Sequence, residues 1–211
     1  MSWIDISQPL TNDIAHWPED QPFVYETTIT KENSGSVNIG RITTSTHIGT
    51  HVDAPFHYDS SGRRILDLDI NRYIGDCQVI DLSEFDTLSA EAFKNKLTKP
   101  AERVLIKTSL RNNPKYFPEN VPGITSDGAD YLNTLGVKLV GVDTPSVDDI
   151  SSKDLQGHHA LYHHDIYILE NVMLDSIEPG NYELIALPLA IAEADGSPVR
   201  AVIRRKEVSH G

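Results

Sequence analysis

Apolar and polar residues alternate along much of the first half of the chain. The alternation occupies residues 3–6, 23–27 and 37–43. Because successive side chains of a strand point to opposite faces of a sheet, this period of two predicts β-strands. Two short continuous apolar runs, residues 77–82 and 104–107, also have the length of strands. We therefore expect strands to dominate the first half.

Two later segments carry helical signals instead. Ser89 can cap a helix over residues 90–97, in which apolar residues four positions apart share one face. Ser126 or Asp127 can begin a second helix, which would run through residue 135 and end at Gly136.

The second predicted helix lies between two strand patterns, residues 104–107 and residues 137–142. Strand, helix and strand in this order predict a βαβ crossover. The last third returns to strand patterns, at residues 166–169, 182–186 and 199–203. We expect an α/β fold that is rich in sheet, with peripheral helices. A length of 211 residues fits a single domain over residues 1–211.

Composition and charge narrow the range of partners. Hydrophobic residues make up 39% of the chain, as in ordinary globular proteins, and the formal net charge is −13. A field of that sign repels nucleic acid and anionic membranes, so we expect neither as a partner. Cys77 is the single cysteine and lies in an apolar run, which predicts a buried strand residue and no internal disulfide.

The chain shows no signal for a membrane. No apolar stretch approaches the roughly 20 residues that span a bilayer. The N-terminus carries Asp5 where a secretion signal would carry basic residues followed by an apolar core. We therefore expect a cytoplasmic protein.

Residues 46–57 hold a dense group of potential metal ligands, namely His47, His51, Asp53 and His57. Gly49 and Pro55 interrupt this segment and disfavour a regular helix. All four side chains are separated by even numbers, so an extended path would direct them to one side. Imidazole and carboxylate are ligands that zinc and similar divalent metals prefer, and Asp53 has two oxygens with which to bridge two metals. The alternative is a row of polar side chains on a solvated strand.

A second group lies more than a hundred residues further on. Residues 156–164 contain four histidines, which are His158, His159, His163 and His164. An apolar strand pattern then ends in Glu170, where a carboxylate is costly unless it is paired or bound to metal. A histidine and Glu170 can therefore complete a site begun by the first group, although each histidine taken alone can equally be a surface or packed residue. His16 and His210 stand apart from both groups.

The segment from His47 to His57 resembles the H-x-G-T-H-x-D-x-P-x-H signature of the cyclase family of metal-dependent hydrolases. Within that family the chain is most similar to the bacterial kynurenine formamidases, or arylformamidases. The resemblance covers nearly the whole chain, and it continues in residues 3–7, 141–146, 158–159, 168–171, 182–188 and 197–202.

The resemblance implies two divalent metal ions per subunit, usually zinc. It assigns His47, His51 and Asp53 to one metal and lets Asp53 also touch the second. Glu170 would bridge both, and His158 would complete the second metal. His159 could fill that place instead, but the family's spacing to the glutamate favours His158.

The same resemblance assigns His57 as the acid/base residue and Trp17 as a residue that lines the substrate pocket. It also implies a homodimer and a swivelling β/β/α fold. The expected reaction is hydrolysis of N-formyl-L-kynurenine to L-kynurenine and formate in tryptophan degradation, with His57 giving a proton to the departing aniline nitrogen. Two alternatives stay open. The same site can serve another amide or a cyclic imide-like substrate, and the chain can be a metal-binding protein without catalysis.

Overall fold

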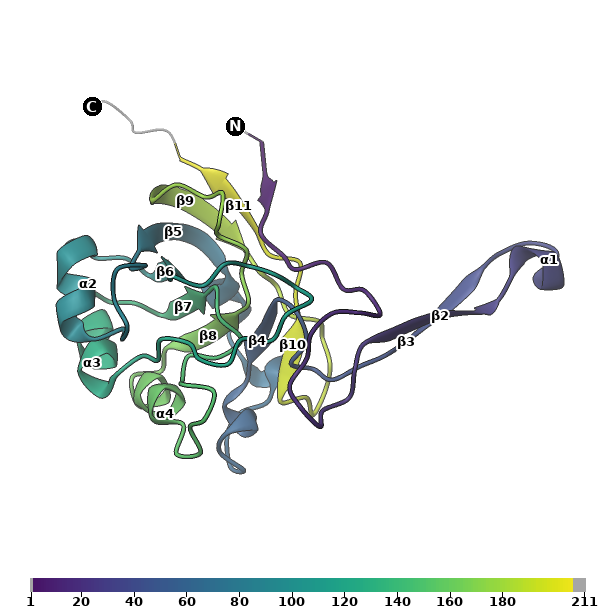
Figure 1. Cartoon of the computed structure of the whole chain (residues 1–211), viewed down its shortest axis with the longest axis horizontal. Coiled ribbons are helices and arrows are strands. Elements are labelled where there is room, and N and C mark those ends of the chain that lie inside the picture. The colour runs from purple at the N-terminus through teal and green to yellow at the C-terminus, as the bar shows by residue number, and fades with distance from the viewer. Residues whose placement is uncertain (1, 207–211) are drawn as a thin grey trace.

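The computed structural model describes residues 2–206, and a nine-stranded mixed sheet forms the centre of the main body (Figure 1). In spatial order its strands are β1 (Ile4–Asp5), β11 (Val202–Arg205), β9 (Gly180–Ile185), β5 (Ile74–Asp81), β6 (Arg103–Lys107), β7 (Leu139–Val142), β8 (Tyr167–Glu170), β4 (His51–Asp53) and β10 (Gly196–Pro198). Strands β5 to β8 run parallel, and the other neighbours are antiparallel. The predicted sheet-rich α/β class is confirmed.

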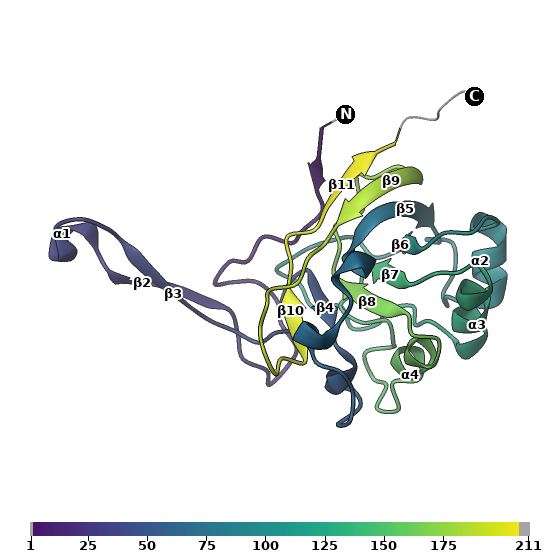
Figure 2. The same ribbon diagram turned by 180° about the vertical axis from the view of Figure 1, so that it is seen from behind.

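Three helices lie along one side of the sheet, as Figures 1 and 2 both show. They are α2 (Ala90–Lys96), α3 (Ser126–Thr134) and α4 (Gln156–His163), and short 3-10 helices Pro55–His57, Ile65–Asp67 and Ile70–Tyr73 connect β4 to β5. Ser89 caps α2 as predicted, and β6, α3 and β7 form the predicted crossover with parallel strands. Within residues 2–206, no helix is long and apolar enough to cross a membrane.

The sequence patterns did not predict helix α4, and the hydrogen bonds of its first turn explain why. The residue before it, Leu155, has a φ of 44° and offers no side-chain cap. The Asp148 carboxylate accepts hydrogen bonds from the backbone N–H groups of Gly157 and His158 instead. A cap that comes from nine or ten residues away leaves no trace in the local sequence.

Alternation along the strands divides the body into two hydrophobic cores. On β8, Leu169 packs into the core on one face of the sheet, and Ile168 packs into the core beneath the helices. Val52, in the middle of β4, joins Leu169, so the other two residues of β4 face the helix side. The predicted burial of Cys77 on a strand is confirmed as well. The alternation thus directs polar side chains of β4 toward α4.

A two-stranded ribbon projects from this body (Figures 1 and 2). It consists of β2 (Val24–Ile29), the short helix α1 (Lys31–Ser34) and β3 (Ile39–Thr43), and we call residues 24–43 the arm. The strands predicted at residues 23–27 and 37–43 are confirmed. Alternation is typical of half-buried strands, yet every residue of β2 and β3 is exposed.

Candidate metal centre

Strands β4 and β8 and the first turn of α4 bring four ionisable side chains together. His51 and Asp53 come from β4, and Glu170 lies directly opposite His51 in the sheet register. His158 reaches them from α4. Each of the four residues is at most 3% exposed. Burying so many ionisable groups costs free energy unless they are paired or bound to a cation.

The distances describe a ring of atoms around a common space. His51 Nε2 lies 3.5 Å from Asp53 Oδ1 and 3.3 Å from Glu170 Oε2. His158 Nε2 lies 3.4 Å from Asp53 Oδ2 and 3.7 Å from Glu170 Oε1. Most of these separations are too long for good hydrogen bonds, which indicates that the atoms face a ligand between them. His47 Nδ1 joins the ring at 2.9 Å from Asp53 Oδ1.

Two atoms of this ring test whether a metal fits. His51 Nε2 and Asp53 Oδ2 are buried and have no hydrogen-bond partner within the described chain. His51 Nδ1 lies 2.8 Å from the Gly49 carbonyl oxygen, so it carries the proton and leaves a lone pair on Nε2. Buried acceptors that face one space without a donor are costly, whereas a divalent cation would satisfy both. The residues present therefore fit a metal.

Within the described part of the chain, the candidate ligands form three groups. One consists of His47, His57 and Asp195, and the other two share Asp53. His47, His51 and Asp53 make the first of these two, and Asp53, His158 and Glu170 make the second. In each group one ligand atom per residue lies within 4.8 Å of the others. Asp53 stands between the two groups that share it, where its two oxygens can face two ions. The structure thus brings together all five residues that the sequence assigned to metal.

Hydrogen bonds behind the ligands orient them. His158 Nδ1 lies 2.6 Å from Asp148 Oδ2, so Nδ1–H donates to the carboxylate and Nε2 faces the site. The Val147 N–H donates to Glu170 Oε1 at 3.0 Å. His159 is exposed and lies outside the ring. Of these two neighbours, His158 is therefore the candidate ligand. Sequence reasoning missed Asp148, although this residue follows residues 141–146, which carry part of the family resemblance, by only two positions.

His57 reaches the site by a route different from the one expected. The extended path is wrong outside β4, because residues 46–50 bend and residues 55–57 form a 3-10 helix with Pro55 in its first turn. Gly49 has a φ of 55°, which a residue with a side chain rarely adopts. The bend and the short helix still bring His57 against His47, with ring centroids 3.8 Å apart.

A further acid, Asp195, joins this side of the site. Its Oδ2 lies 3.1 Å from His47 Nε2 and 3.7 Å from His57 Nδ1, and the Thr46 hydroxyl donates to its Oδ1 at 2.7 Å. Sequence reasoning missed Asp195, because it lies in the loop before β10 and matches no local pattern. His16 lies with Trp17 at a neighbouring hollow, and His210 lies outside the described residues.

The charges of the site favour cations. Burial opposes protonation of His47, but hydrogen bonds and charges from Asp195 and Asp53 outweigh it and raise the pKa of His47 to about 10. Asp148 and Asp53 likewise overcome burial and raise the pKa of His158 to about 10. Although burial alone would raise it, contacts with His158 and His47 hold the pKa of Asp53 well below its usual range. The surrounding carboxylates thus favour positive charge at these nitrogen positions, which a bound divalent cation would also supply.

A cavity of about 380 Å³ opens onto these residues. His47, His51, His57, His158 and Glu170 form part of its lining, and Trp17 forms part of its wall. The Trp17 ring packs edge-on against Phe117, with centroids 4.8 Å apart. Small-molecule sites typically have about 300–1,000 Å³, so the cavity suits a small substrate.

Comparison with known proteins places this chain in a family. The sequence profile of the family described as "Putative cyclase" matches residues 4–149. The chain belongs to this cyclase family. The kynurenine formamidase of Bacillus cytotoxicus is 53% identical to it over 202 residues, which cover 96% of this chain and 97% of that protein. That of Bacillus anthracis is 52% identical with the same coverage. The predicted similarity to bacterial kynurenine formamidases is confirmed.

Solved structures share the fold at lower identity. One described as a potential metal-dependent hydrolase with cyclase activity gives a TM-score of 0.82 at 24% identity, over 98% of this chain and 99% of that chain. An isatin hydrolase bound to the product analogue thioisatinate gives a TM-score of 0.80 at 22% identity, over 97% and 92%. These likenesses extend to nearly the full length of each chain.

Proposed function

We propose that this protein is a metal-dependent kynurenine formamidase, which hydrolyses N-formyl-L-kynurenine to L-kynurenine and formate. One observation carries the proposal. Two ligand groups meet at Asp53 beside a substrate-sized cavity that His47, His51, His158 and Glu170 line, and within residues 2–206 the buried atoms His51 Nε2 and Asp53 Oδ2 have no hydrogen-bond partner. The relatives at about half identity that bear this name support the choice of substrate.

In this proposal His47, His51 and Asp53 hold one divalent ion, and Asp53, His158 and Glu170 hold a second. Imidazole and carboxylate donors suit zinc. Such ions supply Lewis-acid polarisation of a carbonyl and a nucleophilic water at neutral pH. The contribution of the chain is to fix the donor atoms, which Gly49 does for His51 and Asp148 does for His158.

His57 takes the role of proton donor. Amide hydrolysis must release an aniline nitrogen, which is a poor leaving group as an anion, so it needs a proton. The His57 side chain is 35% exposed, lines the cavity and belongs to neither group that contains Asp53. An imidazole free of metal can deliver a proton near neutral pH. Trp17 offers the substrate ring a flat apolar face.

A second copy of the chain covers the arm in this proposal. Six large hydrophobic residues of the arm are exposed, and they are Val24, Tyr25, Ile29, Val37, Ile39 and Ile42. An isolated two-stranded ribbon is marginally stable at best, so these side chains need a surface. The acids Glu26 and Glu32 balance Lys31 and Arg41, so the arm is neutral within a chain of net charge −13. It can therefore approach another copy without strong repulsion.

Turnover of N-formyl-L-kynurenine, measured beside isatin and other cyclic amides, tests the activity. We expect the formamide to have the highest kcat/KM and the purified protein to carry two metal ions per chain. Hydrolysis of the cyclic amides alone would assign the site to a different substrate. Bound metal without turnover of any of them would indicate a binding protein.

A further inference from the structure

The cavity has two chemically different ends. The buried residues His51, His158 and Glu170 line its inner end, and more exposed charged residues line its rim. Those rim residues are Asp20, Asp149 and Lys153. Lys153 is the one lysine or arginine in the lining of this cavity. The apolar side chains of Trp17, Ile150 and Leu155 provide wall area as well.

Lys153 is an exposed cation without a carboxylate of its own. The lysines that form ion pairs within residues 2–206 are Lys96, Lys115 and Lys206. Hydrogen bonds hold the backbone on both sides of Lys153, because the Ser152 N–H donates to the Asp149 carbonyl and the Leu155 N–H donates to the Ser152 hydroxyl. The backbone at Lys153 is thus fixed beside the cavity, and its side chain forms part of the lining.

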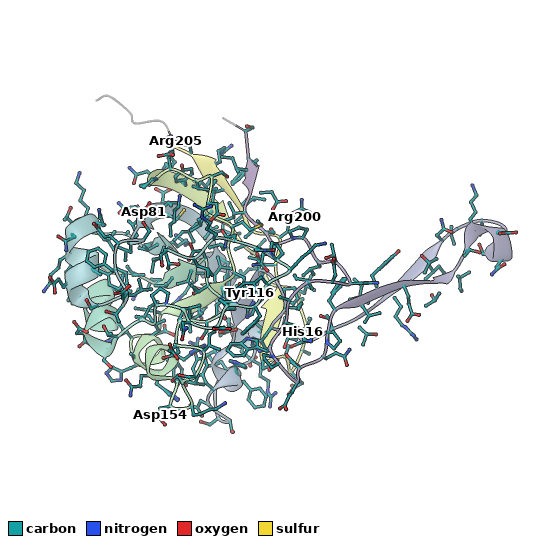
Figure 3. All side chains as sticks on the ribbon, viewed as in Figure 1. His16, Asp81, Tyr116, Asp154, Arg200 and Arg205 are labelled. Carbon is teal, nitrogen blue, oxygen red and sulfur yellow. The ribbon has the colours of Figure 1, made fainter. Side chains whose placement is uncertain are left out.

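The cavity lining also takes an acid from a segment far away in sequence. Asp20 is half-buried and follows Trp17 in the segment that leads to the arm. Figure 3 labels His16, on the side of the body from which the arm projects, and Asp154, at the lower edge of the body. The lining thus takes one acid, Asp20, from the segment before the arm, and both Asp149 and Lys153 from the loop before α4.

We propose that this rim binds the α-amino-acid group of the substrate, with Lys153 pairing with its carboxylate and Asp20 with its ammonium group. The inference rests on the proposed function. A formamide placed at the inner end directs its aryl ring along Trp17, and the amino-acid chain attached to that ring then extends toward the rim. Separate positive and negative groups at fixed positions recognise a zwitterion, whereas they give a neutral aryl formamide nothing to bind.

Kinetics on three substrates test the assignment. They are N-formyl-L-kynurenine, its analogue that keeps the amine but lacks the carboxylate, and formanilide, which lacks both groups. For Lys153→Met we expect kcat/KM for N-formyl-L-kynurenine to fall about 5- to 20-fold relative to each of the others, between the effect of an exposed ion pair and that of a charged hydrogen bond. The loss should lie in KM, because the contact is made equally in the ground state and the transition state.

Matched variants complete the design. Lys153→Arg should restore most of the preference, and Asp20→Asn should weaken both substrates that carry an ammonium group. Lys99→Met removes the same charge outside the cavity lining and should change no substrate preference. Equal losses on all three substrates, or none, would overturn the assignment of Lys153. Failure of the wild-type protein on N-formyl-L-kynurenine, with turnover of formanilide, would instead overturn the proposed function and the rim assignment with it.

Equilibrium binding gives a readout that is independent of turnover. Kynurenine carries the amino-acid group, and 2-aminoacetophenone presents the same ring without it. Titration calorimetry should show that Lys153→Met weakens kynurenine on the same 5- to 20-fold scale while 2-aminoacetophenone binds as before. A parallel weakening of both ligands would show that the variant disturbs the cavity itself.

Discussion

The body and the arm break the usual rule of burial in opposite ways. The body buries ionisable groups, among them His51, Asp53, His158 and Glu170, at the edge of its core. The arm leaves large apolar side chains in water, with Ile42 61% exposed. Buried polar groups and exposed apolar groups are the informative exceptions in a folded protein. In the proposed function, a divalent cation offsets the first exception and a second copy of the chain covers the second.

The two regions are joined at the cavity. Trp17 comes shortly before β2, and His47 comes shortly after β3. At the root of the arm the Ser45 N–H donates to the Gln21 carbonyl at 3.3 Å, which ties the two connecting segments together. A protein surface that covered the arm would therefore lie close to Trp17 in the cavity wall and to His47, one of the candidate metal ligands.

The largest effect should come from removing the residue that the two ligand groups share. Asp53→Ala takes a donor from both groups and should abolish binding of both metals, with a loss of about 10⁴-fold or more in kcat/KM, since metal polarisation contributes several kcal/mol. His47→Ala removes a donor from only one of the two groups that contain Asp53 and should retain one metal. Metal analysis and kinetics on the same samples decide the matter. Two metals per chain in Asp53→Ala would refute the shared role.

The arm can be tested without touching the cavity. Replacing Ile39 and Ile42 together by lysine removes two exposed side chains, each worth about 1.5–3 kcal/mol when buried. We expect the proposed dimer to dissociate about 10²- to 10⁴-fold more readily by analytical ultracentrifugation, with metal content unchanged. The double variant Asn33→Lys and Ser36→Lys adds the same charge at the tip and serves as the control. An unchanged dimer in the first variant would remove the arm from the interface.

A substitution of His57 distinguishes between two roles of this residue, proton donor and metal ligand. It lies against His47 but outside both groups that contain Asp53, so His57→Ala should keep its metals and its fold. Loss of a general acid costs about 10²- to 10⁴-fold in kcat. The loss should shrink for aryl formamides whose anilines are more acidic, because these leave with less help. Loss of a metal ion would make His57 a ligand instead.

Asp148 tests the hydrogen bonds behind the metal ligands. Asp148→Asn keeps the size of the side chain but weakens its contact with His158 Nδ1. Loss of such an orienting contact typically costs 10- to 100-fold in metal affinity. Competition with a chelator should show that loss for one ion of the two. An equal loss for both ions would point to a general disturbance of the loop and α4.

The sequence predicted the body better than the paths that complete its site. Strands β5 to β9 have local apolar patterns, and the ligands in residues 47–57 stand close together in sequence. Asp148 and Asp195 act across the fold, so no local spacing reveals them. His57 and His51 reach the same cavity only because the chain bends before β4 and forms a 3-10 helix after it. The even spacing of these residues in the sequence predicts neither feature. The exposure of β2 and β3 depends on which parts of the chain pack against them, and the alternation of apolar and polar residues does not predict that packing.

Asp143 is a second buried acid of the body, and it tests whether such an acid always needs a cation beside it. It follows β7, is fully buried, and accepts hydrogen bonds from the N–H and hydroxyl of Thr108 at 2.9 and 2.8 Å. Burial outweighs these bonds and raises the pKa of Asp143 from 3.8 to about 7. Burial thus favours the protonated form of Asp143, whereas contacts with His158 and His47 favour the charged form of Asp53.

The sign of the resulting pH dependence follows from that shift. Because the pKa of Asp143 is higher in the folded than in the unfolded chain, its contribution to stability is complete below about pH 4 and is lost as the pH rises through 7. Asp143→Asn imitates the protonated form, since its amide can both accept from the Thr108 N–H and donate to the Thr108 hydroxyl. Urea unfolding of metal-free protein should show that the wild type loses about 1–2 kcal/mol more than this variant between pH 5 and pH 7. Asp86→Asn removes the same charge from an exposed site and should follow the wild type. If the wild type and Asp143→Asn change in parallel, Asp143 is ionised throughout, and a cation or a donor must compensate it as at Asp53.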